Sequence, residues 1–78
     1  MTPKQVRAAR ALLGWTQAKL AREAGVGIAA VGNCEHELRR PSFGALGAIR
    51  EALERAGVEF TNGKKPGVRF GRSKSKGT

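Results

Sequence analysis

The sequence predicts a mainly α-helical fold, in which four helices are followed by a short C-terminal β-hairpin and a disordered basic tail. Three observations lead to this fold class. Apolar residues recur at helical spacing through the first two thirds of the chain, the period then changes to two, and the last residues offer no apolar side chain to bury. We therefore expect a helical domain over residues 1–57, a hairpin over 58–70 and a tail over 71–78.

The first helix is expected over residues 3–13. Thr2 is a suitable N-cap, and Gln5 stands where it closes a capping box with that threonine. Gly14 is a typical C-terminal stop. The apolar residues that recur at helical spacing are Val6, Ala9, Leu12 and Leu13.

Two shorter helices follow. One begins after the N-cap Thr16 and ends before Gly25. The next covers about residues 28–37, with Gly27 as its cap and Gly32 in its interior, where glycine costs about 1 kcal/mol relative to alanine. Their spaced apolar positions are Leu20, Ala21 and Ala24 in the first, and Val31, Cys34 and Leu38 in the second.

The fourth helix opens at Pro41 and Ser42 and closes at Gly57. Glu51 and Arg55 form a favourable i,i+4 pair on its surface. Its apolar positions are Leu46, Ile49, Leu53 and Ala56.

The segment after Gly57 has a two-residue period. Val58-Glu59-Phe60 is echoed by Val68-Arg69-Phe70, and Asn62-Gly63 lies in the connection, which predicts a hairpin with Glu59 opposite Arg69. Because an isolated two-stranded hairpin is marginal in water, it must pack on the helices or on a second chain.

The residue counts exclude several classes of function. One cysteine allows neither an internal disulfide nor a multi-cysteine zinc site, and one histidine without any aspartate allows no Ser-His-Asp triad. We expect no enzyme, no metal, no cofactor and no small-molecule ligand. The sequence shows no signal peptide and no membrane span, so we expect a cytoplasmic protein.

The charge distribution points to an anionic partner. The formal net charge is +9: residues 1–60 hold nine Lys/Arg and six Glu, whereas residues 61–78 hold six Lys/Arg and no acid. Nucleic acid is the first partner to consider for such a chain. The tail is either a solubilising end or an arm that tracks phosphates without reading sequence.

The middle of the chain has a characteristic spacing at Ala21, Gly25, Val31 and Cys34. A small residue lets two helices approach closely, Gly25 tolerates the positive φ of a tight turn, and the last two residues place the next helix against the first. This spacing resembles the Cro/repressor-type (Xre-like) helix-turn-helix family. The resemblance covers about residues 5–56, and it extends to 13–17 (Leu-Gly-Trp-Thr-Gln), 24–26 (Ala-Gly-Val), Asn33 and Glu35.

The resemblance implies a set of DNA-binding residues. The first motif helix would hold a phosphate, and the next helix would enter the major groove and read base edges. Only Asn33 among the outward positions of the second helix has a side chain suited to a bidentate bond, with adenine preferred. The implied residues are Thr16, Gln17 and Lys19; Gly27, Ile28, Ala29, Ala30, Gly32, Asn33 and His36; and Arg39 and Arg40 in the loop that follows.

Four further side chains can be interpreted individually. Lys19 lies in the first turn of a helix, where a positive charge is unfavourable with the helix dipole, and a phosphate bound there would interact favourably with both. We expect Glu35 to bond Arg39 or Arg40, or to cap backbone groups, rather than to face DNA. We expect Cys34 to be a small buried residue and Trp15 to be core between the first and fourth helices.

The function expected from these observations is that of a sequence-specific double-stranded DNA-binding transcriptional regulator, bacterial or phage in type, that represses by occluding a promoter. Residues 57–60 and 66–70 are similar to the C-terminal segment of short bacterial members of this family that finish in a hairpin. Because the core is small and the hairpin is marginal, we also expect a homodimer, with an interface through Val58, Phe60, Val68 and Phe70. Two alternatives stay open: a protein-interaction module such as an antitoxin, favoured by a large unfilled apolar patch, and non-specific nucleic-acid binding through the tail.

Overall fold

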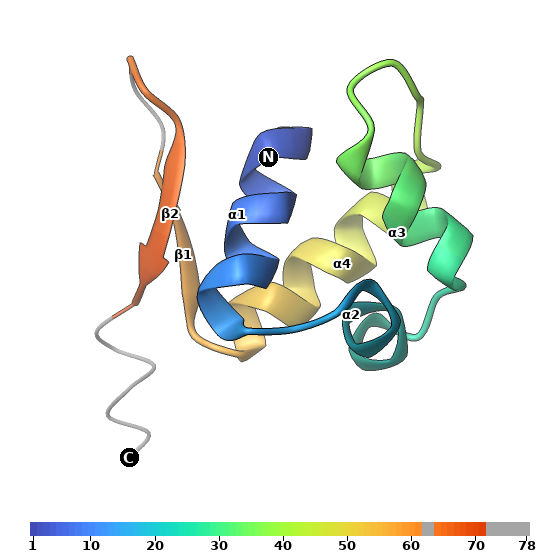
Figure 1. The fold of residues 1–78 in the computed structure, drawn as a ribbon, viewed down its shortest axis with the longest axis horizontal. Helices are drawn as coiled ribbons and strands as arrows, with labels where there is room; N and C mark the ends of the chain where they lie inside the picture. Colours follow the sequence, from blue (N-terminus) through green and yellow to red (C-terminus); the bar gives the residue numbers. More distant parts are fainter. Residues whose placement is uncertain (62–63, 72–78) are drawn as a thin grey trace.

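The computed structural model describes residues 1–61 and 64–71, so the predicted Asn62-Gly63 turn and residues 72–78 of the predicted tail lie outside the described residues. It confirms four helices followed by an antiparallel hairpin. The hairpin lies beside α1 on one side of the domain, with α2 and α3 on the other (Figure 1). The elements are α1 (Pro3–Leu13), α2 (Gln17–Ala24), α3 (Ile28–Glu35), α4 (Phe43–Arg55), β1 (Val58–Thr61) and β2 (Gly67–Phe70).

Side-chain caps begin three of the helices, as the sequence predicts for Thr2 and Thr16. The Thr2 and Gln5 pair forms a complete capping box at the start of α1. The hydroxyl oxygens of Thr16 and Ser42 accept hydrogen bonds from backbone N–H groups in the first turns of α2 and α4. Gly14 ends α1 in the left-handed conformation, with a φ of 70° that favours glycine.

The core draws on all four helices and on the first residue of the hairpin. Its buried apolar side chains are Val6, Ala9, Leu20, Ala21, Val31, Cys34, Ile49, Ala52, Leu53 and Val58. Trp15 is half-buried and packs against this cluster, which agrees with its predicted core role.

Two apolar residues do not take the buried positions that the sequence predicts. Leu38 is 90% exposed, because α3 ends at Glu35 and His36 turns to extended backbone, so Leu38 lies in the following loop. Leu12 is 37% exposed, because it lies about a quarter turn away from the line of Val6, Ala9 and Leu13 on α1.

The hairpin is fastened to the helices of its own chain. Glu59 pairs with Arg69 in register, as predicted, and their side chains form an ion pair at 2.5 Å. The Gln5 amide nitrogen donates to the carbonyl oxygens of Thr61 and Gly67, both at 3.0 Å, and so joins α1 to both strands. Gly71, expected to start the tail, is instead buried, and its N–H donates to a carbonyl oxygen at the start of the hairpin.

Three of the four residues predicted at a dimer interface pack on the helices of their own chain. Val58 is buried, and Phe60 and Val68 pack partly buried against the core of their own chain. Of the four residues expected at a dimer interface, only Phe70 is exposed, at 54%. The helices therefore already occupy most of that apolar face.

Gln5→Ala should lower the free energy of unfolding by about 2 kcal/mol, because it removes half of the capping box and leaves two strand carbonyls without their donor. Urea denaturation measures the effect. Arg69→Ala removes an exposed ion pair on the same hairpin and should cost no more than about 0.5 kcal/mol. Equal losses for the two variants would contradict the role given to Gln5.

Candidate nucleic-acid interface

The tight turn between α2 and α3 sets how the two helices meet. Gly25 ends α2 with a φ of 71°, and the next residue, Val26, donates its N–H to the Ala21 carbonyl oxygen at 3.0 Å. Buried Leu20 and Ala21 of α2 and buried Val31 of α3 belong to the same core cluster. The inner faces of both helices are thereby fixed, and their outer faces remain at the surface.

The twelve predicted DNA-contacting residues all reach the surface, and none of them is buried. They form two groups, one on the first turn of α2 and one on α3 with the loop after it. Exposed members are Thr16, Gly27, Ile28, Ala29, His36, Arg39 and Arg40, and half-buried members are Gln17, Lys19, Ala30, Gly32 and Asn33.

A buried carboxylate joins three helices behind this surface. Glu35, at the end of α3, is only 5% exposed. Arg10 of α1 donates to both of its oxygens, from Nε at 2.7 Å and from Nη2 at 3.1 Å. The amide of Gln17 on α2 donates to Oε1 at 3.0 Å. Glu35 in turn raises the pKa of the Arg10 guanidinium, chiefly through this hydrogen bonding.

The partner expected for Glu35 was wrong. Its carboxylate binds Arg10 and Gln17 rather than Arg39 or Arg40, because its side chain points inward toward α1 and α2 while the loop arginines are exposed. Arg10 and Arg7 are supporting residues that were not predicted from the sequence. The two arginines are three residues apart and therefore lie on the same face of α1. This spacing is the sequence signal that they could share a partner.

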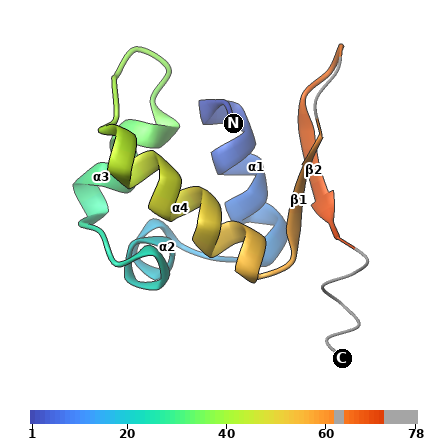
Figure 2. The same ribbon diagram turned by 180° about the vertical axis from the view of Figure 1, so that it is seen from behind.

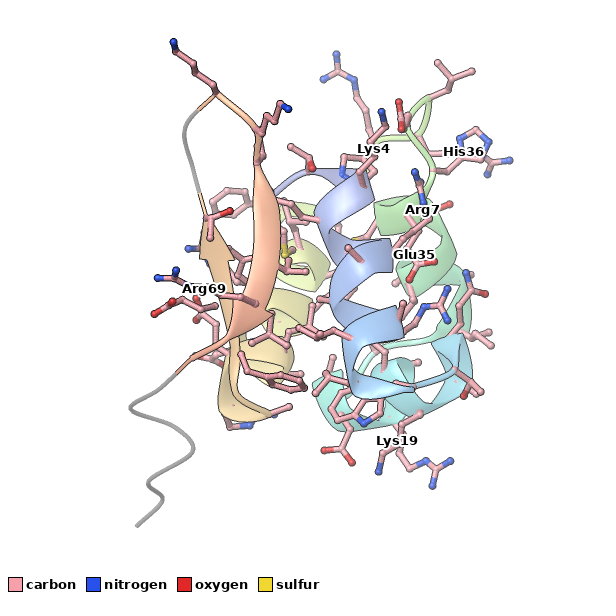
Figure 3. The ribbon with its side chains drawn as sticks, turned by 60° about the vertical axis from the view of Figure 1, so that its left-hand side comes forward. Lys4, Arg7, Lys19, Glu35, His36 and Arg69 are labelled. Atoms are coloured by element: carbon pink, nitrogen blue, oxygen red, sulfur yellow. The ribbon has the colours of Figure 1, made fainter. Side chains whose placement is uncertain are left out.

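Arg7 fixes the end of α3 from outside. Its guanidinium donates to the backbone carbonyl oxygen of Glu35, and it forms an ion pair with Glu37 at 3.4 Å. Figure 3 shows Arg7 and Glu35 side by side between α1 and α3, with His36 beyond them and Lys19 at the opposite end of the view. A cation beside the last turn also suits the negative end of the helix dipole.

A hollow of about 330 Å³ lies on the outer side of α3. It is lined by Ala29, Gly32, Asn33, His36 and Arg39. Arg39 donates to the side-chain oxygen of Asn33 at 3.5 Å, and the Nδ1 atom of His36 accepts the Leu38 N–H at 3.2 Å. Arg39 and Asn33 each have further N–H donors that these contacts do not use, and those donors face outward.

Lys19, in the first turn of α2, is already engaged by neighbouring side chains, which the sequence did not predict. The Lys19 ammonium pairs with Glu23 at 2.8 Å and lies 5.5 Å from the centre of the Trp15 ring. This lysine lowers the pKa of the Glu23 carboxyl through their hydrogen bond. Glu23 thus offsets part of the unfavourable placement of a cation near a helix start.

The remaining positive charge is concentrated on a few side chains. Every one of the six glutamates pairs with a lysine or an arginine. Within residues 1–61 and 64–71, the cations left without an acidic partner are Lys4, Arg22, Arg39, Arg40, Lys64 and Lys65. Two of them are the loop arginines that follow α3, so this end of the hollow has a net positive charge.

Two further features concern other kinds of partner. In the described part of the chain, no three His, Cys, Asp or Glu side chains gather where they would hold a metal ion. None of the helices described is long and apolar enough to cross a membrane. Cys34 is buried, and burial raises the pKa of its thiol.

The comparison with known protein families matches residues 6–60 to the family described as helix-turn-helix. The matched segment contains α1 from Val6 onward, all of α2, α3 and α4, and most of β1, and it includes all twelve residues of the candidate interface. The comparison with curated proteins gives no match.

Glu35→Gln should lower the free energy of unfolding by about 2 kcal/mol, because the half-buried Arg10 charge loses its counter-charge. Glu54→Gln is a matched control, since Glu54 pairs with Arg50 at an exposed i,i+4 position, and it should cost at most about 0.5 kcal/mol. Chemical denaturation monitored by circular dichroism measures both. Similar costs for the two substitutions would show that the buried pair does not hold the helices together.

Proposed function

Because the chain belongs to the Cro/repressor-type (Xre-like) helix-turn-helix family of DNA-binding regulators, we propose that it binds a specific duplex site and represses transcription by occluding a promoter. The observation that carries this proposal is the outer side of α3. There a hollow with outward-facing polar groups is continuous with the positively charged loop that contains Arg39 and Arg40.

The outer side of α3 is suited to the major groove. Gly27, Ala30 and Gly32 present little side-chain bulk, so the helix backbone can approach base edges closely. Ile28, which is 54% exposed, and Ala29 offer methyl groups for thymine, and Asn33 offers an amide for adenine. We therefore expect an A·T-rich half-site, with His36 and Arg39 at the edge of the contacted bases.

Phosphate contacts supply most of the affinity in this account. The Gln17 amide has two hydrogens, of which one bonds Glu35, and the second is available to a phosphate oxygen. Thr16, Lys19, Arg39 and Arg40 lie on the same two segments and complete the backbone contacts. Each phosphate neutralised should contribute about −0.9 to the slope of log K against log salt.

Occlusion of a promoter is the mechanism that we propose for the described residues. The described residues form one helical core with its hairpin, and we assign them DNA binding alone. As a homodimer in the cytoplasm, the protein would bind two half-sites whose centres lie about one helical turn apart.

Two substitutions separate base reading from phosphate binding. Asn33→Ala should reduce the preference for the native duplex, taken from upstream of its own gene, over a scrambled duplex by about tenfold, because a bidentate base contact is lost. Arg40→Ala should weaken binding to both duplexes equally and make the salt slope shallower by about 0.9. Fluorescence anisotropy at two salt concentrations measures both effects.

The outcomes are distinct. Equal binding of the wild type to native and scrambled duplexes, lost together as salt rises, would reject sequence-specific regulation. An Asn33→Ala variant that keeps the full preference would remove Asn33 from the reading surface.

A further inference from the structure

The loop between α3 and α4 exposes side chains that the fold itself does not use. Leu38 is 90% exposed and Phe43, the first residue of α4, is 93% exposed, the two highest values among the large apolar residues described. Arg39 and Arg40 lie between them, and neither has an acidic partner within the residues that the structure describes. Figure 2 shows this loop projecting beyond the ends of both helices, clear of the hairpin. Such a surface is suited to a partner that offers both acidic and apolar contacts.

The same segment presents an exposed hydroxyl group, that of Ser42. Its oxygen accepts the backbone N–H of Ala45 at 3.1 Å. This contact uses a lone pair, so the hydroxyl proton stays available to a base. Ser42 has an extended backbone, with φ −67° and ψ 150°, and residues 39–42 lie outside the helices. The hydroxyl is therefore accessible to an enzyme that binds its substrate as an extended segment.

The order of the side chains around Ser42 matches the substrate pattern of protein kinases that select basic segments. Residues 39–43 are Arg-Arg-Pro-Ser-Phe, so two arginines stand three and two residues before the serine, and an aromatic ring follows it directly. Such kinases pair the arginines with carboxylates of their substrate groove and hold the next residue in an apolar pocket. We propose that Ser42 is a phosphorylation site for a serine/threonine kinase of this class.

The start of α4 is built to open locally. Gly44 and Gly47 lie in its first half, where glycine is the least favourable residue after proline. A Cβ atom added at either position would meet nothing within 4 Å, so packing does not require glycine there. Helix ends open at a lower free energy than the whole domain. Opening of the first turn lets Phe43 enter the kinase groove together with Ser42.

The reaction is a phosphoryl transfer from ATP, which the kinase supplies. The Ser42 hydroxyl oxygen attacks the γ-phosphorus, and the new O–P bond replaces the bond between that phosphorus and the oxygen bridging to the β-phosphate. ADP leaves, and the hydroxyl proton passes to the catalytic carboxylate of the kinase. No group of this chain other than the hydroxyl takes part in the transfer.

Phosphorylation would change the charge of the proposed DNA surface. The phosphate carries about −1.5 to −2 charges near neutral pH, which offsets most of the charge of Arg39 and Arg40. Residues 39 and 42 are at most about 10 Å apart along the chain, within reach of an arginine side chain, and arginine binds phosphate through two hydrogen bonds. The attached phosphate would therefore compete with DNA phosphates for both arginines. This consequence rests on the proposed function, whereas the modification itself does not.

Treatment of the folded full chain with ATP and purified cyclic-AMP-dependent protein kinase tests the site. Peptide mass spectrometry should find a phosphate on Ser42, and Ser42→Asn should remove it. Because asparagine is also a good N-cap, this variant should keep the wild-type circular dichroism spectrum. Ser73 and Ser75 are internal competitors, since basic residues precede them as well. Phosphate only on these two serines, or on none, would overturn the proposal.

Fluorescence anisotropy tests the consequence for DNA binding. Ser42→Asp and Ser42→Asn are nearly isosteric and both can cap the helix, so they differ mainly by one negative charge. Ser42→Asp should bind DNA about threefold more weakly than Ser42→Asn, and phosphorylation of the wild type should weaken binding at least about tenfold, equally on native and scrambled duplexes.

The two claims fail in different ways. Equal affinity of the phosphorylated and unmodified chains would overturn the link between phosphorylation and release of DNA. A lack of preference for the native duplex in the unmodified chain would instead reject the proposed function, and it would leave the mass spectrometric result at Ser42 untouched.

Discussion

The structure depends on one buried carboxylate. A charge that leaves water must be paired and hydrogen-bonded, and Glu35 meets this requirement only if α1, α2 and α3 all keep their places. Arg10 supplies two hydrogen bonds from α1, Gln17 supplies one from α2, and Arg7 holds the carbonyl oxygen of the same glutamate. In a small domain whose apolar core is limited, this network fixes the angle at which α3 is presented.

The residues that hold α3 in position are largely different from those proposed to contact DNA bases. The residues that hold α3 lie behind it, and those proposed to meet DNA lie on its outer side and in the loop that follows. Gln17 belongs to both sets, since one amide hydrogen is held by Glu35 and the other is free for a phosphate oxygen. Under the proposed function, a change of operator preference would therefore require substitutions only on the outer side of α3, where Ile28 and Ala29 are exposed and Asn33 is half-buried.

Local signals in the sequence were enough to predict the helix boundaries and the hairpin. They could not predict contacts between residues that are far apart in the chain. Thr2, Gly14 and Gly25 mark helix ends through interactions within a few residues, so the boundaries of α1 and α2 were predictable. The partner of Glu35 lies 25 residues away on another helix, and sequence spacing alone favoured the nearer Arg39 and Arg40. The early end of α3, which leaves Leu38 exposed, likewise lies at a long-range contact, because Arg7 of α1 donates to the carbonyl oxygen of Glu35, the last residue of α3. None of the twelve candidate DNA-contacting residues is buried, as expected from their place on the outer side of the motif.

Selection of binding sites from a pool of random duplexes, carried out with the full chain at physiological salt, is the most direct test of sequence-specific binding. We predict enrichment of an inverted repeat whose A·T-rich halves have centres about one helical turn apart. Recovery of no common motif, with all sequences retained equally and released together by salt, would contradict it and leave a protein that binds DNA through charge alone.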